Sequence, residues 1–331
     1  MSKNILFFIS SLNGGAENQL YKLFELLKDE NEARYVVAKA ENSNSNVIGL
    51  NKKKTIFAIP GLIKEIIKLK PDVLFTTLPT PNFLNVLIKK ISFFKYKSIC
   101  RVANYNINLK TTNFIVKNSD IVFFNSVENF NIYADMFPKY KNKFVYLNNI
   151  INPYKENVDK PSLRPRVRAL IASRLVHNKG IDIAIKAMNE IDNDNISLDI
   201  YGEGPEANSL KTMSTNPNTV FKGYTNYLND HWKSYNLFLL PSRQEGMSNS
   251  LLEAQLNNIY SIVSNCKTGN EEIINLTDNG ACFNTGDYQD LKKSIINFYE
   301  NESLTKYSRQ IIIENFSDTN AKSILKKTLN I

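Results

Sequence analysis

The sequence predicts an α/β protein with two doubly wound, Rossmann-like domains. Short apolar runs alternate with amphipathic helical stretches along the 331 residues, which is typical of repeated βαβ units with a parallel sheet. The alternation stops once, in a polar segment at 148–165, and then restarts. The length also favours two domains of about 150 residues each. Two such domains would face each other across a cleft between the carboxyl ends of their strands, where these folds bind ligands.

In the first half, apolar runs bounded by turn residues predict six strands. They are expected at 5–10, 34–38, 72–76, 98–102, 120–124 and 144–147. Between the first two, the stretch 16–28 places Leu20, Leu23 and Leu27 on one face of a helix.

The second half repeats the pattern and ends in helices. Strands are expected at 167–172, 197–201, 219–221, 237–240, 260–263 and 280–283. A final helical region is expected from about 287 to the end, interrupted near 315–317.

Composition limits the class of protein. The first apolar run has only five residues before a turn, so it predicts a buried strand and not a signal peptide. The three cysteines lie far apart without a CxxC pair, which favours reduced thiols in the cytoplasm. The two histidines, His177 and His231, belong to no cluster, so no zinc site is expected. The net charge of +9 suits a nucleic acid, an anionic membrane or a phosphorylated substrate equally well.

Three expected strand-to-helix turns contain glycines or cations that suit a diphosphate. Gly14 and Gly15 let a helix amino terminus approach an anion, although the GxGxxG spacing typical of NAD binding is absent. In the second half, Arg174 and Lys179 bracket the corresponding turn, and two cations with a helix amino terminus can neutralise a diphosphate without a metal. Gly202 ends the next strand at the same edge, where a tight turn alone also explains it.

The most informative turn follows the fourth expected strand of the second half. We expect Ser248 or Asn249 to cap the next helix, and the free amides around Met247 to face the diphosphate. Glu253 lies further along that helix, where a carboxylate suits the hydroxyls of a ribose. Glu245 lies on the loop itself, nearer the reacting centre.

Together these motifs resemble retaining glycosyltransferase family 4, the bacterial polysaccharide-type group 1 enzymes with the GT-B fold. The matching motifs are Gly14-Gly15-Ala16-Glu17, Ser-Arg-Leu-x-x-x-Lys-Gly at 173–180, Gly202-x-Gly204-Pro205, Phe221-Lys222-Gly223-Tyr224, and Pro-Ser-x-x-Glu-Gly at 241–246 with a second Glu at 253. The resemblance implies an acceptor-side domain over 1–155, a nucleotide-sugar-binding domain over 156–312, and a helix over 313–331 that packs back on the first domain.

The resemblance also implies a role for each motif residue. Glu245, Arg174 and Lys179 would be catalytic: the cations would hold the donor diphosphate and stabilise the leaving group, and the carboxylate would position the donor sugar. Donor binding would involve Gly14, Gly15, Gly202, Tyr224, Met247, Ser248, Asn249 and Glu253.

The sequence departs from the family in the first domain. Many members have a histidine near the donor sugar, but the comparable stretch 101–106 has none. Arg101, Asn104 or Tyr105 would take its place on the acceptor side.

The resemblance implies transfer of a hexose or N-acetylhexosamine from a nucleotide sugar, with UDP expected, to a growing glycan, with retention. No metal and no other cofactor is expected. The acceptor would be a saccharide on polyprenyl diphosphate, met from the cytoplasm at the inner face of the membrane. The basic and aromatic stretch 89–97 would contact anionic headgroups, unless Phe93 and Phe94 pack under their helix.

Other functions fit the sequence less well. A metal-dependent transferase would use Asp192 and Asp194, which lie away from the expected cleft. A sugar-nucleotide 2-epimerase of the same architecture would need acid–base groups in the cleft, and histidine is scarce. A catalytically silent partner subunit would lack Glu245, Arg174 or Lys179, and all three are present. A nucleic-acid binder would interleave aromatic and basic residues on one strand face, and the sequence has no such pattern.

Overall fold

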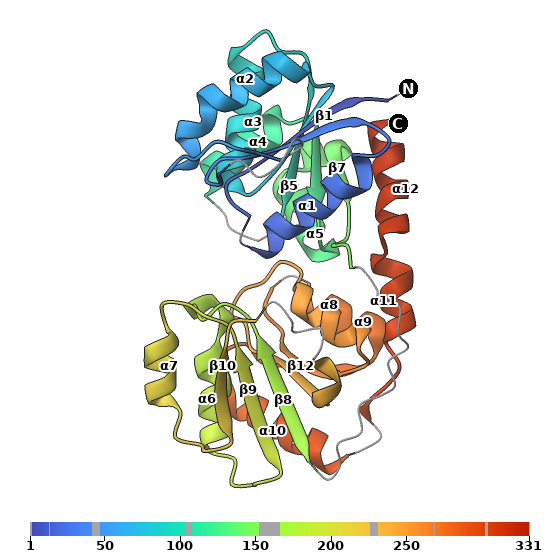
Figure 1. The fold of residues 1–331 in the computed structure, drawn as a ribbon. Helices are drawn as coiled ribbons and strands as arrows, with labels where there is room; N and C mark the ends of the chain where they lie inside the picture. The colour runs from blue at the N-terminus through green and yellow to red at the C-terminus, as the bar shows by residue number, and fades with distance from the viewer. Residues whose placement is uncertain are drawn as a thin grey trace. The chain divides into compact units, whose positions relative to one another are not determined.

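The structure, a computed structural model, divides into two compact units (Figure 1). Unit 1 contains Met1–Ile150 and Asp318–Ile331, and unit 2 contains Ile151–Ser317. The residues described are 2–12, 14–41, 47–103, 108–151, 166–225, 231–267, 269–301 and 304–330. No helix within these ranges is long and apolar enough to cross a membrane.

Unit 1 is built on a seven-stranded parallel sheet in the order β3-β2-β1-β4-β5-β6-β7. The strands are β1 (Asn4–Ile9), β2 (Glu32–Val37), β3 (Val47–Gly49), β4 (Val73–Thr77), β5 (Lys97–Val102), β6 (Ile121–Phe124) and β7 (Phe144–Tyr146). The helices are α1 (Gly15–Leu27), α2 (Ile59–Leu69), α3 (Pro79–Ile91), α4 (Leu109–Asn118), α5 (Val127–Met136) and α12 (Asp318–Leu329), with 3-10 helices η1 (Thr55–Ala58) and η2 (Pro138–Lys143). All six predicted strands are present. Sequence analysis missed β3, because three residues are too few to show a period.

Helices cover both faces of the unit 1 sheet (Figure 1). Phe7 packs in one core with α1 and α12, whereas Leu6 and Phe8 pack in another with α2 and α3. A parallel sheet that is buried on both faces explains why β1 is a continuous apolar run and not an alternating one. Lys3 Nζ donates to the carbonyl oxygen of Leu329 at 2.8 Å, which holds the end of α12 beside β1.

Unit 2 is built on a six-stranded parallel sheet in the order β10-β9-β8-β11-β12-β13. The strands are β8 (Val167–Ala172), β9 (Ile196–Tyr201), β10 (Thr219–Gly223), β11 (Leu237–Leu240), β12 (Tyr260–Ser264) and β13 (Gly280–Phe283). The helices are α6 (Ile181–Asn189), α7 (Ala207–Met213), α8 (Asn249–Leu256), α9 (Asn270–Thr277), α10 (Tyr288–Glu300) and α11 (Arg309–Phe316), with 3-10 helices η3 (His177–Lys179) and η5 (Trp232–Ser234). The ends of the predicted strands in both units differ from these bounds by at most two residues. The doubly wound α/β prediction is confirmed.

The two faces of the unit 2 sheet have separate cores. One contains α6, α7 and α10, and the other contains α8, α9 and α11. The last helical region is divided between the units. Phe316 at the end of α11 belongs to the second of these cores, Ser317 is extended (φ −71°, ψ 158°), and α12 begins at Asp318 in unit 1.

Candidate functional site

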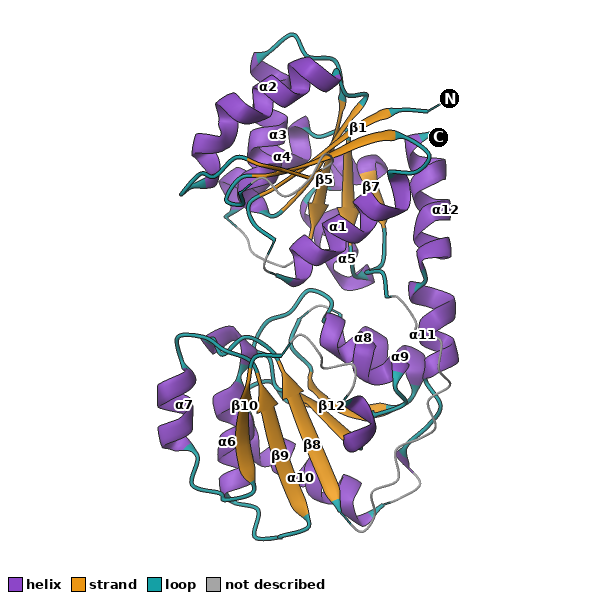
Figure 2. Cartoon of the chain, viewed as in Figure 1, coloured by secondary structure: helices purple, strands orange, loops and turns teal. Residues whose placement is uncertain are grey.

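Three loops, which follow β8, β9 and β11, meet at the carboxyl edge of the unit 2 sheet. Figure 2 shows that β8 and β9 run in the same direction. The loop after β8 ends at Gly180, which has a left-handed φ of 63°. A Cβ at Gly180 would lie 2.0 Å from the carbonyl oxygen of Pro241, and one at Gly202 would lie 1.8 Å from that of Ser173. Glycine is required at both positions because the loops pack backbone against backbone.

An ion pair also joins the loops after β8 and β11. The Arg243 guanidinium donates to both carboxylate oxygens of Asp182, in the first turn of α6, at 2.7 Å each. It also donates to the carbonyl oxygen of His177 at 2.9 Å. Burial acts to raise the pKa of Asp182, but the hydrogen bonds and charge of Arg243 lower it below its ordinary value. Sequence analysis missed this pair, because no local pattern links residues 61 positions apart.

Two of the predicted catalytic residues are in contact. Lys179 Nζ lies 2.5 Å from Glu245 Oε1, and Ser242 Oγ donates to the same oxygen at 2.8 Å. Glu245 is only 8% exposed, so the ammonium and the hydroxyl stabilise a carboxylate that would otherwise be costly to bury. Arg174, the third predicted residue, is exposed on the same loop as Lys179.

The amino terminus of α8 follows Glu245 along the same loop. Its N-cap is Ser248, whose Oγ accepts from the Leu251 N–H at 3.4 Å, so the cap is not Asn249. Met247 and Ser248 are buried, and Asn249 is half-buried. Glu253, also half-buried, lies one turn further along α8. The helix amino terminus adds positive potential at this edge of the sheet.

The remaining predicted donor residues lie elsewhere. Tyr224 is exposed directly after β10 in unit 2. Gly14 and Gly15 lie at the start of α1 in unit 1. There Glu17 is in the first turn of α1, close enough that a Cβ on Gly14 would lie 2.3 Å from its Oε2. An anion bound at this helix terminus would therefore require the Glu17 carboxylate to move.

Within the described ranges, no three His, Cys, Asp or Glu side chains are arranged to hold a metal ion. Asp192 and Asp194 lie in the turn before β9, at the edge of the sheet opposite to the amino terminus of α8.

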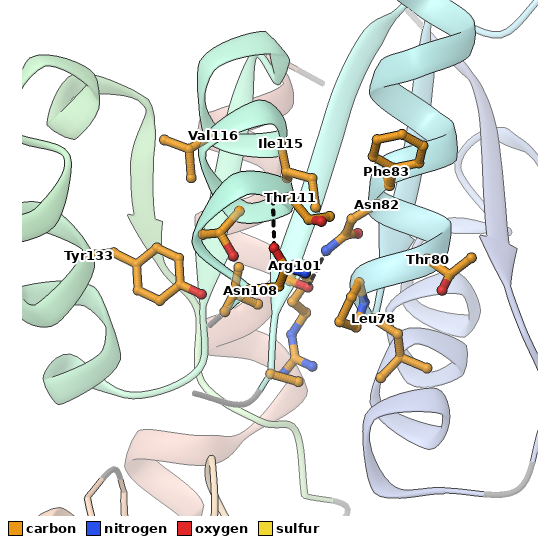
Figure 3. Close-up of a pocket in the computed structure, with 14 residues that line it drawn as sticks. Leu78, Thr80, Asn82, Phe83, Arg101, Asn108, Thr111, Ile115, Val116 and Tyr133 are labelled. Carbon is orange, nitrogen blue, oxygen red and sulfur yellow. Dashed lines mark hydrogen bonds between the residues drawn. The ribbon is translucent and has the colours of Figure 1, made fainter. Parts of the chain in front are cut away.

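Unit 1 contains a pocket of about 420 Å³ where β4 and β5 end, between α3 and α4 (Figure 3). Arg101, which sequence analysis places on the acceptor side, lines this pocket but is only 1% exposed. Its Nη2 donates to Asn149 Oδ1 at 2.5 Å. Asn104 and Tyr105, the other two acceptor-side candidates, lie outside the described residues.

Comparison with known proteins identifies the second half of the chain. Residues 155–316 match the family described as glycosyl transferases group 1. The second half of the chain therefore resembles the group 1 glycosyltransferases. The matched segment includes the loops after β8, β9 and β11 and the amino terminus of α8, and therefore every unit 2 residue of the candidate site.

Two curated relatives match parts of this chain. Protein CapJ of Staphylococcus aureus is 32% identical over 114 residues, which are 32% of this chain and 29% of that protein. The GtfA subunit of a UDP-N-acetylglucosamine–peptide N-acetylglucosaminyltransferase from Limosilactobacillus reuteri subsp. suis is 27% identical over 186 residues, 53% of this chain and 34% of that protein. The matches span 29% and 34% of these relatives' lengths.

A solved structure resembles the chain over its whole length. Anabaena HepE, in complex with UDP and glucose, has a TM-score of 0.82 and covers 99% of both chains, with 16% sequence identity. At that identity the likeness shows the fold.

Proposed function

We propose that this protein transfers a sugar from a UDP-sugar to a saccharide acceptor. The observation that supports it most is the Lys179–Glu245 pair on the loops before α8, at the carboxyl edge of the unit 2 sheet. Cations and free helix amides at one place stabilise the charge that develops on a departing diphosphate. The UDP in the HepE complex favours the same nucleotide here.

The contacts in the site indicate a separate role for each side chain. Arg174 and Lys179 neutralise the donor diphosphate, so the site supplies positive potential without a metal. Glu245 is held by Lys179 and Ser242, so it accepts hydrogen bonds from donor-sugar hydroxyls and is not a free nucleophile. Glu253 accepts hydrogen bonds from the ribose. Transfer then proceeds with retention, with the departing phosphate as the base. The group 1 match gives the 2-epimerase alternative no support.

Calorimetric titration with UDP tests the donor site. Arg174→Ala and Glu253→Ala are each expected to weaken UDP binding by about tenfold or more, because each removes a charge-assisted contact. Arg166→Ala is the matched control, since Arg166 is an exposed arginine at the other end of β8 and should not affect binding. Unchanged affinity in both site variants would overturn the donor assignment.

The acceptor proposal is a saccharide on polyprenyl diphosphate, met at the cytoplasmic face of the membrane. At the end of α3, Phe93 is fully exposed and Ile91 is 73% exposed. The exposed Lys90 and Lys95 flank them. Apolar side chains between lysines suit an anionic lipid surface.

Three residues of the predicted membrane stretch have internal roles instead. Lys89 pairs with Asp120, and Phe94 and Tyr96 pack in the core that contains α2 and α3. They are therefore excluded from the proposed membrane surface, which consists of Lys90, Ile91, Phe93 and Lys95.

Flotation with anionic vesicles tests the membrane surface. Binding is expected to fall as salt rises, and to fall strongly in Phe93→Ser and in Lys90→Gln with Lys95→Gln. Lys267→Gln, at an exposed lysine of unit 2, is the control. If the wild-type protein does not float with anionic vesicles at low salt, a soluble acceptor replaces the lipid-linked one.

A further inference from the structure

The pocket in unit 1 presents no charged side chain among the lining residues that the structure describes. Side chains alternate along β5, so Ile99 packs in the core with α1 and α12, whereas Cys100 packs with Ile115 of α4 on the opposite face. Arg101 therefore projects to the face of α1 and α12, where it donates to Asn149 Oδ1, and it lines the pocket only with its backbone. Figure 3 shows its guanidinium turned away from Ile115. A ligand in this pocket would therefore be surrounded by neutral groups of the described lining.

The interior of the pocket is apolar. Its volume is about 420 Å³, which is typical of a small-molecule site and large enough for a monosaccharide. Phe83 and Ile115 belong to the small core between α3 and α4, and Leu78 lies at the other end of the pocket in Figure 3. Phe83 and Leu78 are both half-buried, so part of each side chain remains open to a ligand. An apolar substituent that covered them would be removed from water, which stabilises the complex.

Hydroxyl groups near the start of α3 and α4 remain available for hydrogen bonds. Thr80, Thr111 and Thr112 line the pocket, and their hydroxyls have no hydrogen-bond partner among the described residues. Thr111 and Thr112 are half-buried, whereas Thr80 is exposed. Each hydroxyl can both donate and accept, so the pocket suits a ligand with hydroxyl or amide groups.

This combination of groups disfavours three classes of ligand. A phosphate or carboxylate would be buried without a cation. An aliphatic chain would bury the hydroxyls of Thr111 and Thr112 without partners. A plain hexose would place hydroxyls against Phe83 and Ile115, whose side chains have no hydrogen-bonding group. An acetamido group has both parts that the pocket requires, because its methyl group is apolar and its amide donates and accepts hydrogen bonds.

We propose that this pocket binds the acetamido group of an uncharged N-acetylhexosamine. The methyl group lies against Phe83 and Ile115, and the amide bonds the hydroxyls of Thr111 and Thr112. The inference rests on the proposed function and deepens it, because this sugar would be the terminal unit of the saccharide acceptor. It names the class of acceptor that unit 1 recognises and the side chains that select it.

Saturation-transfer NMR with methyl glycosides tests the ligand class. The glycosides of N-acetylglucosamine and N-acetylgalactosamine carry the acetamido group, those of glucose and galactose lack it, and that of glucosamine carries a cation instead. The tighter-binding acetamido glycoside is expected to bind at least about tenfold more tightly than the three others, with the strongest saturation on its acetyl methyl protons. Equal affinity for a glycoside without the acetamido group would overturn the proposal. So would farnesol, below its aggregation limit, if it bound as tightly as the acetamido glycoside.

Variants then place the sugar in this pocket. The double variant Thr111→Val with Thr112→Val is expected to weaken binding by at least about tenfold, because the amide loses two hydrogen bonds while the side-chain volumes hardly change. Thr112→Trp, which fills the pocket from α4, should abolish the saturation of the acetyl methyl group. Asn113→Trp, at the next and exposed position, should not. If Thr112→Trp does not fold, the double variant still decides the test. Wild-type affinity in a folded site variant would show that the sugar binds elsewhere, and the proposal would be wrong.

Titration of the same samples with UDP separates this inference from the proposed function. The glycosides are added in the presence of saturating UDP, which keeps them out of the donor site. A wild-type protein that binds UDP but neither acetamido glycoside would overturn the pocket proposal and leave the donor site intact. A protein that binds an acetamido glycoside in this pocket but ignores UDP would support the pocket and overturn the donor function.

Discussion

Removing the ammonium of Lys179 should destabilise unit 2 by an amount that the contacts of Glu245 determine. Loss of one partner from a buried ion pair costs about 3–5 kcal/mol, because the other charge is left uncompensated. Here Ser242 Oγ still donates to Glu245 at 2.8 Å, so we expect the lower value, about 3 kcal/mol, for Lys179→Met. For a unit of this size, that corresponds to a fall of about 6–12 °C in melting temperature.

The double variant distinguishes a true pair from two independent contributions. Glu245→Gln added to Lys179→Met removes the orphaned charge, so the double variant should be more stable than Lys179→Met alone, with a coupling of about 2 kcal/mol. Trp232, the one tryptophan of the sequence, is buried in a unit 2 core, so its fluorescence during urea unfolding reports this unit. Additive effects, or a Lys179→Met variant within about 0.5 kcal/mol of wild type, would refute the reasoning.

Three further predictions concern the loops and the chemistry. Gly180→Ala should lower the free energy of unfolding in urea by more than about 2 kcal/mol, because the new Cβ meets a backbone oxygen at 2.0 Å. Gly223 also has a left-handed φ, 75°, but a Cβ there would meet no atom within 4 Å, so Gly223→Ala should cost only about 1 kcal/mol. Equal costs for the two variants would contradict the steric argument. The Asp182 carboxylate has a lowered pKa in the folded state, so its stabilisation is present above the unfolded value of 3.8 and is lost as the pH falls below it. Arg243→Gln should therefore lower the unfolding free energy by about 1 kcal/mol at pH 7 and by progressively less under acid; a pH-independent difference would show that the ion pair is not responsible. Sugar transfer should persist in EDTA, and a loss of transfer that manganese restores would mean that the site needs a metal.

Local pattern alone determined the elements of this fold. A strand such as β8 is recognisable because buried parallel strands are continuous apolar runs between turn residues, and this signal needs no distant partner. Turn chemistry likewise placed Lys179, Glu245 and the cap of α8 after strands, and the parallel order then predicts that they lie at one edge. Such patterns could not predict the three-residue strand β3, nor that Ser248 and not Asn249 caps α8.

Only the tertiary structure decided which side chains touch. Lys179 contacts Glu245 across 66 positions, and Lys89 contacts Asp120 across 31, which removes that lysine from the membrane stretch to which its sequence context assigned it. Nothing in the sequence indicated that Arg101 is buried, because an arginine at the end of a strand is exposed in most proteins and its burial here depends on distant residues such as Asn149. Local sequence specifies backbone conformation through short-range sterics and periodicity, whereas pairing and burial depend on which elements the whole chain brings together.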